Sequence, residues 1–323
     1  MKGLLILFWP YQTKSIITGI LIASLLWVLP VTANEQSEPA RLASRTLLLD
    51  ITLAGTRIVA VGERGIVLTS DDSGKTWQQK LVPTRSQLTA VFFIDERVGW
   101  AVGFDAVILA TIDGGDSWIL QHRDKQYDDP LLDVWFKDRN NGFAIGAYGL
   151  FLSTNDGGKS WDRRQISKDD FHLNAITSLS GNQLFIAAEQ GHLYRSIDGG
   201  YSWTELPSPY AGSFFGITRI NQQTMLVYGL RGNLFRSADK GVTWKKIETG
   251  TEASLMAALV QKNGTIRIVG LGGNILTSTD QGKKFSLRVR ADRKTLTSII
   301  EATDGQLVMS GSAGITIEAG DSK

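Results

Sequence analysis

The residues best suited to metal binding or catalysis are few and scattered. The chain has three histidines, His122, His172 and His192, and no cysteine. None of the histidines belongs to an HxxxH or HExxH motif, and no Gly-x-Ser-x-Gly nucleophile turn is present. Metal-dependent and nucleophilic catalysis need such residues at close spacing. We therefore expect no metal site, no cofactor, no catalytic residue of these classes and no disulfide.

Carboxylates are the second candidates for chemistry. Glycoside hydrolysis uses two of them across a cleft, or a Tyr nucleophile facing arginines. Adjacent pairs occur at Asp128–Asp129 and Asp169–Asp170, in segments expected to be loops. Such pairs are more often solvated loop charges than catalytic pairs. A glycan-binding or glycoside-hydrolysing protein of the sialidase type nevertheless stays open as the alternative function, because sialidases carry the motif described next.

Six further aspartates recur in one motif, Ser/Thr-x-Asp-x-Gly-x-Ser/Thr-Trp. Its copies include Thr154–Trp161 (TNDGGKSW) and a decayed sixth copy that ends in Lys284-Phe285. The aspartates are Asp72, Asp113, Asp156, Asp198, Asp239 and Asp280. The aromatic residues that end the copies lie 41–43 residues apart, a spacing typical of propeller blades.

The chemistry of this motif predicts a structural turn, an Asp-box. The carboxylate can accept hydrogen bonds from turn amides, and the glycine can adopt a positive φ. The Trp is expected to pack between neighbouring blades. Six equivalent turns around a ring cannot converge on one site, so we interpret the six aspartates as structural rather than catalytic or metal-binding.

Between the boxes the chain predicts four short strands per unit, with turns between them and no helical periodicity. The seventh unit, residues 296–319, provides only three strands. We expect Glu35–Arg45 to supply the fourth and so close the ring without an exposed sheet edge. The prediction is an all-β, seven-bladed β-propeller of four-stranded antiparallel blades, one domain over residues 34–323.

The first 33 residues predict a secretory signal peptide. Lys2 and Lys14 precede an apolar stretch, Ile16–Leu29, and cleavage is expected between Ala33 and Asn34. An uncleaved anchor is the alternative. The net charge of +2 disappears with the two leader lysines, so the mature protein is neutral and a poor binder of nucleic acid. We expect a periplasmic protein, or a lumenal one if the source is photosynthetic.

The leader, the seven units, second strands such as Gly99–Gly103 (GWAVG) and the boxes together resemble the photosystem II stability/assembly factor family of Asp-box (BNR-type) propellers. The resemblance covers essentially the whole mature chain. It implies a non-enzymatic scaffold, expected to be a monomer, that assists assembly of a membrane complex by binding its subunits. The expected partner is thus a membrane or secreted protein subunit, in an assembly or export machinery, with no small-molecule substrate.

The turn between second and third strands opens on the same propeller face as the inter-blade loops, opposite the boxes. Arg and Tyr, which are favoured at interface hot spots, recur in these segments. The candidate partner-binding residues are Arg64, Arg85, Arg123, Tyr127, Tyr148, Tyr210, Phe214, Arg231, Arg290 and Arg293. An Arg-containing patch on this face is also what the resemblance implies, with Arg64 and Arg231 as the closest matches by position.

Overall fold

The computed structural model describes residues 35–124 and 129–320. The predicted leader and its cleavage site at Ala33–Asn34 lie outside the described residues, as do Tyr127 and Asp128.

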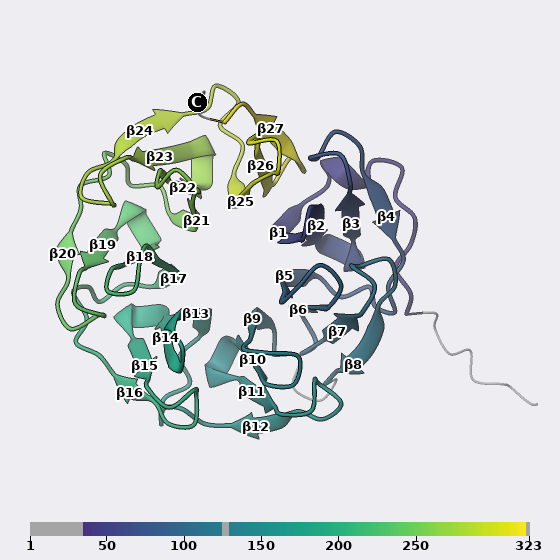
Figure 1. The fold of residues 1–323 in the computed structure, drawn as a ribbon, viewed down its shortest axis with the longest axis horizontal. Helices are drawn as coiled ribbons and strands as arrows, with labels where there is room; N and C mark the ends of the chain where they lie inside the picture. Colours follow the sequence, from purple (N-terminus) through teal and green to yellow (C-terminus); the bar gives the residue numbers. More distant parts are fainter. Residues whose placement is uncertain (1–34, 125–128, 321–323) are drawn as a thin grey trace, which may run out of the picture. The chain divides into compact units, whose positions relative to one another are not determined.

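Seven antiparallel sheets are arranged around a central axis like the blades of a propeller (Figure 1). Blades 1 to 6 have four strands each and blade 7 has three, always in chain order from the axis outward. The predicted all-β seven-bladed propeller is confirmed.

The strands of each blade are named by their distance from the axis. The innermost strands are β1 (Leu48–Ala54), β5 (Leu88–Phe93), β9 (Leu131–Phe136), β13 (Leu173–Ser180), β17 (Phe214–Arg219), β21 (Leu255–Val260) and β25 (Leu296–Glu301). The second strands are β2 (Arg57–Gly62), β6 (Gly99–Gly103), β10 (Gly142–Gly146), β14 (Gln183–Ala188), β18 (Met225–Gly229), β22 (Ile266–Gly270) and β26 (Leu307–Gly311). The third strands are β3 (Val67–Ser70), β7 (Ile108–Thr111), β11 (Phe151–Thr154), β15 (Leu193–Ser196), β19 (Leu234–Ser237), β23 (Asn274–Ser278) and β27 (Thr316–Glu318). The outer strands are β4 (Gln78–Lys80), β8 (Ile119–His122), β12 (Asp162–Arg164), β16 (Thr204–Glu205), β20 (Lys245–Lys246) and β24 (Ser286–Val289).

Six short 3-10 helices complete the described structure. They are η1 (Ala43–Arg45), η2 (Glu63–Gly65), η3 (Ala147–Gly149), η4 (Glu189–Gly191), η5 (Leu230–Gly232) and η6 (Leu271–Gly273). All but η1 form the turn between a blade's second and third strands.

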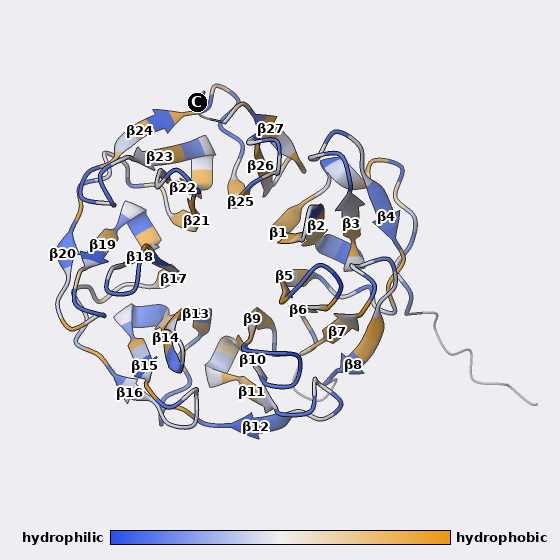
Figure 2. Ribbon diagram, in the orientation of Figure 1, coloured by the Kyte–Doolittle hydropathy of each residue, from blue (hydrophilic) through white to orange (hydrophobic). Residues whose placement is uncertain are grey.

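The core lies between the faces of neighbouring blades. Second strands such as β6 and β10 are buried along their whole length, because both faces of each blade are covered by other blades. Outer strands are mostly hydrophilic (Figure 2). The box tryptophans lie at the seams between blades: the ring of Trp161 meets Phe136 edge-on, with the ring centroids 5.9 Å apart.

The ring closes differently from the prediction. The backbone N–H of Ser37 donates to the Val82 oxygen at 2.8 Å, so the N-terminal segment runs beside blade 1 and adds no strand to blade 7. Pro39 offers no N–H for a sheet ladder, which disfavours a strand there. Blade 7 meets blade 1 through side chains, and Thr297 Oγ1 donates to the Leu48 oxygen at 2.8 Å. The predicted completion of the last blade by Glu35–Arg45 is therefore wrong.

Candidate partner-binding face

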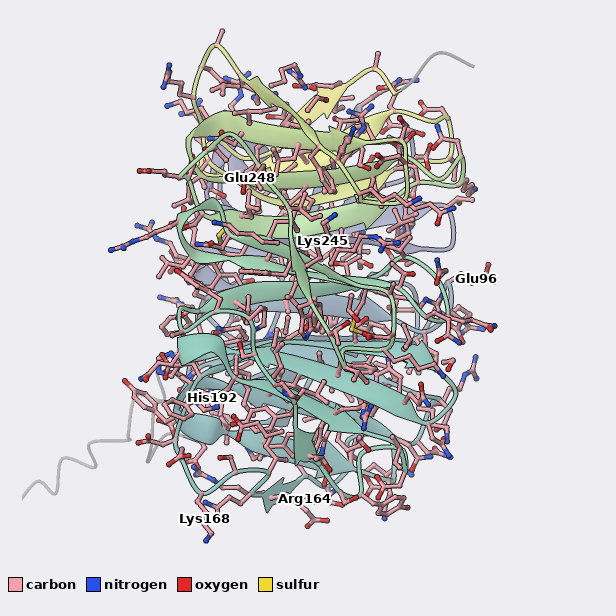
Figure 3. All side chains as sticks on the ribbon, turned by 90° about the vertical axis from the view of Figure 1, so that its left-hand side faces the viewer. Glu96, Arg164, Lys168, His192, Lys245 and Glu248 are labelled. Atoms are coloured by element: carbon pink, nitrogen blue, oxygen red, sulfur yellow. The ribbon has the colours of Figure 1, made fainter. Side chains whose placement is uncertain are left out.

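The second turns and the inter-blade loops share one face of the propeller. The Ala147 N–H donates to Pro130 O at 2.9 Å, and the Leu230 N–H donates to Ser213 O at 3.0 Å. The boxes lie on the opposite face with the turns between first and second strands: the N–H of Gly157, in the third box, donates to Asn140 O at 3.0 Å. Figure 3 looks onto the rim, with His192 of the second-turn face to the left and Glu96 of the box face to the right.

The second turns hold their central residue in the left-handed region. Their φ values are 54° for Arg64, 52° for Tyr148, 52° for Gln190, 55° for Arg231 and 64° for Gly272. A left-handed conformation costs an L-residue roughly 1–2 kcal/mol, whereas glycine adopts it freely. Gly272 shows that glycine serves in this turn. The large side chains of the other turns are thus not required by the backbone, which points to a role at the surface.

Arg64 and Arg231 project into solvent from these turns. Both residues are exposed, and neither forms an ion pair with another described residue. Arg293, which also has a positive φ of 50°, is exposed on the loop that enters blade 7. These three cations are therefore available to an acidic partner.

Three other predicted arginines are already engaged within the chain. Arg85 is half exposed and pairs with Glu38 at 2.8 Å. The Arg123 side chain is largely buried, pairs with Glu35 and donates to Thr84 Oγ1 at 2.6 Å. Arg290 is held between Asp292 and Glu318. Because a neutralised, buried guanidinium offers little to a partner, Arg123 and Arg290 are the weaker candidates.

The predicted aromatic residues separate into surface and core. Tyr148 is exposed, whereas Phe214 is fully buried at the start of β17 and packs against Phe235. Phe214 is therefore a core residue, and its assignment as a partner-binding residue is corrected. It occupies the first position of an innermost strand, which the other blades fill with leucine. Tyr210 is partly exposed and packs on the same core, with its ring centroid 6.0 Å from that of Phe235.

Sequence reasoning missed two exposed apolar side chains on this face, Phe104 and Leu271. Both belong to the second-turn segments, so their place in the repeat was the signal that could have found them. Together with Tyr148 they give the face apolar contact area beside its cations.

The loop between blades 3 and 4 adds an aromatic and histidine cluster to this face. The rings of Tyr148 and His172 meet edge-on at 4.9 Å, and those of Phe171 and His192 stack at 4.0 Å. His192 Nδ1 lies 2.6 Å from Glu205 Oε1. The sequence did not predict this cluster, because its members come together only through the packing of two blades. The third histidine, His122, ends β8, where burial lowers its pKa.

The innermost strands surround a central cavity of about 420 Å³. Asp50 and Asp133 line it, and each carboxylate accepts a backbone N–H from the next blade, that of Val91 at 2.9 Å and that of Ile176 at 2.8 Å. Burial deep in the ring raises the pKa of Asp50 to about 6 and that of Asp133 to about 7. Each of these carboxylates thus links two neighbouring blades by a hydrogen bond.

The box aspartates bond within their own turns. Asp156 Oδ2 accepts from Ser160 Oγ at 2.6 Å, and its Oδ1 accepts from the Ser160 N–H at 3.0 Å. These bonds lower the pKa of Asp156 to about 2. Asp72, Asp113, Asp198 and Asp239 repeat both bonds, and Asp280 accepts backbone N–H groups at the equivalent turn.

Potential metal-ligating side chains are dispersed within residues 35–124 and 129–320. No group of three or more His, Cys, Asp or Glu side chains there is arranged to hold a metal ion. No helix in those ranges has the length and hydrophobicity needed to span a bilayer. Of the carboxylate pairs named above, Asp129 lies 3.8 Å from Arg163, and Asp169 and Asp170 are exposed.

The fold and this face define a seven-bladed Asp-box propeller whose exposed turns offer cations and aromatic rings. A family profile described as "Photosynthesis system II assembly factor YCF48" matches residues 120–264. The resemblance to the photosystem II assembly factor family is thus confirmed over these residues.

Solved structures support the same fold. The structure "YCF48 bound to D1 peptide" has 18% sequence identity and a TM-score of 0.71, and the match covers 86% of this chain and 94% of that one. YCF48 from Cyanidioschyzon merolae has 16% identity and a TM-score of 0.69 over 88% and 99% of the two chains. Streptogramin B lyase, at 15% identity, reaches a TM-score of 0.72 over 85% and 95%. At these identities the matches establish the fold alone. A search of curated proteins gives no match.

Proposed function

We propose that this propeller binds a segment of a membrane-protein subunit on its second-turn face and so assists assembly of a membrane complex. The observation that carries the proposal is the match of residues 120–264 to the YCF48 assembly-factor family, one structure of which holds a D1 peptide. The binding role is non-enzymatic, and its setting is the periplasm or, in a photosynthetic source, the lumen.

The chemistry of the face suits an acidic, partly apolar segment. Arg64 and Arg231 supply exposed guanidinium groups that form no ion pair with another described residue, and Tyr148 supplies an exposed ring. Arg and Tyr are enriched among residues that dominate binding energy, because they combine large contact area with directed hydrogen bonds. A desolvated charge pair that loses one partner costs about 2–5 kcal/mol of binding.

In vivo photo-crosslinking identifies the partner and the face together. A crosslinking amino acid at position 148 should capture a membrane-protein subunit, whereas one at position 201, on the box face, should not. Tyr201 is a suitable control because it is highly exposed. Equal capture from both positions would contradict the assigned face.

Charge reversal tests the role of the arginines. Arg64→Glu combined with Arg231→Glu should abolish co-purification of the captured subunit while leaving the melting curve nearly unchanged, because an exposed turn residue usually contributes within about 0.5 kcal/mol. Salt should weaken binding in part, through screening over about 8–10 Å. The proposal would be rejected if the folded double variant co-purified as much of the subunit as the wild type does. Robust hydrolysis of polysaccharides by the wild type would also reject it.

A further inference from the structure

The central cavity carries acidic groups that no described cation balances. Asp50 from β1 and Asp133 from β9 line it, whereas no lysine, arginine or histidine of residues 35–124 and 129–320 does. No described cationic side chain contributes to the pKa shift of either carboxyl group. Burying a charge without a partner is costly, so buried charges in proteins are normally paired with an opposite charge. The two carboxylates thus make the cavity complementary to a cation.

Each carboxylate keeps acceptor capacity beyond its link to the next blade. An ionised carboxylate offers about four lone-pair sites. Asp133 uses two of them, for one backbone N–H of its own strand and one of the next blade, at 2.8 Å each. Asp50 uses two in the same way and a third for the Ser298 hydroxyl. Both groups can therefore accept further hydrogen bonds from a bound donor.

The other five blades leave space at the level of the two carboxylates. The seven innermost strands surround the axis (Figure 1), and the third residue of each pairs with the equivalent residue of its second strand. All seven third residues line the cavity. In the blades without aspartate they are small, namely Ala90, Ala175, Gly216, Ala257 and Ser298. The cavity of about 420 Å³ thereby falls in the range of about 300–1,000 Å³ that is typical of small-ligand sites.

The walls nearer the second-turn face are largely apolar. Inter-blade loops enter the innermost strands from that face, so the second residue of each strand lies closer to it than the third. Four of the seven second residues are apolar, and they are Leu49, Leu132, Phe215 and Met256. These side chains line the same cavity as the two carboxylates. The cavity therefore suits a ligand with an apolar stem and a charged end.

The donor set fits an ammonium group better than a metal ion. A Ca²⁺ ion takes about 6–8 oxygen ligands. In the described part of the chain, no third His, Cys, Asp or Glu joins Asp50 and Asp133 to form a metal-binding group. A primary ammonium has three N–H donors and no acceptor, so two carboxylates and one further oxygen satisfy it. Its aliphatic stem can pack on the apolar wall.

From these observations we propose that the central cavity binds an alkylammonium group, which donates charge-assisted hydrogen bonds to Asp50 and Asp133. Two sources present such a group. One is a lysine side chain of a partner polypeptide that enters the channel from the second-turn face, and the other is a free aliphatic amine. The site goes beyond the proposed function, because neither Arg64 nor Arg231 takes part in it and either site can fail without the other.

Binding should depend on pH in a defined direction. A bound ammonium favours the ionised carboxylates, whose pKa values burial raises to about 6 for Asp50 and about 7 for Asp133. Binding should therefore release protons and tighten at least tenfold between about pH 5 and about pH 8. Burial raises the pKa of Tyr228, the other titratable group of the lining, to about 12, so it stays neutral. Arg219, which lines a neighbouring cavity with Asp133, donates to Leu179 O at 2.9 Å.

Isothermal titration calorimetry of the full-length protein tests the site with n-butylammonium, which copies the lysine side chain. The ion should bind saturably, and neutral n-butanol should bind at least tenfold more weakly. Titrations in two buffers of different ionisation enthalpy should show proton release, a readout that needs no variant. N-acetyl-lysine methylamide and 1,5-diaminopentane then distinguish the sources, since the natural ligand's mimic should bind more tightly.

A double variant locates the site. Asp50→Asn combined with Asp133→Asn should weaken n-butylammonium binding at least tenfold and abolish proton release, because the asparagine oxygen can still accept a backbone N–H but carries no charge. Asp169→Asn combined with Asp170→Asn is the matched control, since it removes the same charge from an exposed loop and should bind as the wild type does.

Any of four results overturns the proposal. The wild type shows no saturable binding of n-butylammonium, or it binds n-butanol equally well. Alternatively, binding releases no protons near neutral pH, or the folded double variant at positions 50 and 133 binds the ion as the wild type does.

Discussion

The Asp133 carboxylate accepts the backbone N–H of Ile176 across the seam between blades 3 and 4, at 2.8 Å. Asp50 makes the equivalent bond to Val91 across the seam between blades 1 and 2. Both carboxylates line the central cavity. Their pKa values are raised, because the loss of hydration inside the propeller disfavours the charged carboxylate. Asp50 and Asp133, which link neighbouring blades by hydrogen bonds, therefore change their protonation near neutral pH.

The pH dependence of stability follows from these shifts. The pKa values of Asp50 and Asp133 are higher in the folded state than in the unfolded state, so their stabilising contribution is complete below about pH 4 and is lost as pH rises through about 6–7. The box carboxylates have lowered pKa values, so their contribution is lost toward about pH 2. We expect the melting temperature to peak near about pH 5 and to fall on the order of 5 °C by pH 8.

Calorimetry of Asp133→Asn checks this expectation. The variant cannot ionise at this position, so its melting temperature should change less between pH 5 and pH 8 than that of the wild type. Asp170→Asn, at an exposed loop carboxyl, is the matched control. An Asp133→Asn profile that parallels the wild type would show that this group does not titrate in the range.

The structural role of the boxes predicts an order of stabilities in the third box. Trp161→Ala should lower the free energy of unfolding by roughly 3 kcal/mol, the lower end for large aromatic truncations, because the ring is only partly buried. Asp156→Ala should lower the melting temperature by less, because only turn hydrogen bonds are lost. Partner capture by the folded fraction should be unchanged in both. If Asp156→Ala kept full stability but no longer captured the partner, the box would be a binding site and not a structural turn.

The indole nitrogens distinguish two boxes. Trp118 Nε1 donates to Gly115 O at 3.1 Å, whereas the buried Trp161 Nε1 has no hydrogen-bond partner among the described residues. Trp118→Phe should thus cost about 1 kcal/mol more than Trp161→Phe, since only the first loses a hydrogen bond. Urea unfolding of both variants measures the difference, and equal costs would contradict the assignment.

The left-handed turns predict a conflict between stability and binding. Arg231→Gly should raise the free energy of unfolding by about 0.5 kcal/mol, because glycine relieves the strain at φ 55° at some cost in chain entropy. It should at the same time weaken partner capture. Gln190→Gly is the control, with a similar gain in stability and little change in capture. If Arg231→Gly stabilised the protein without weakening partner capture, Arg231 would not be part of the interface.

The leader gives a prediction outside the described residues. Cleavage between Ala33 and Asn34 should produce a soluble protein whose N-terminal sequence begins at Asn34. Fractionation followed by N-terminal sequencing tests this directly. Recovery in the membrane fraction with Met1 intact would show an anchor instead.

The sequence by itself determined the number of blades, the order of strands and the turn chemistry. These features repeat locally every 41–43 residues, so that short-range patterns such as TNDGGKSW specify them. For the same reason the positions of Arg64, Tyr148 and Arg231 on one face could be predicted from the repeat.

Only the tertiary structure decided what depends on contacts between distant residues. It placed Glu35–Arg45 beside blade 1, buried Phe214 and joined Asp133 to Ile176. Each of these outcomes depends on which side chains and backbone groups meet across a seam. A repeat pattern does not encode such pairings, because equivalent positions in different blades carry different residues and meet different neighbours.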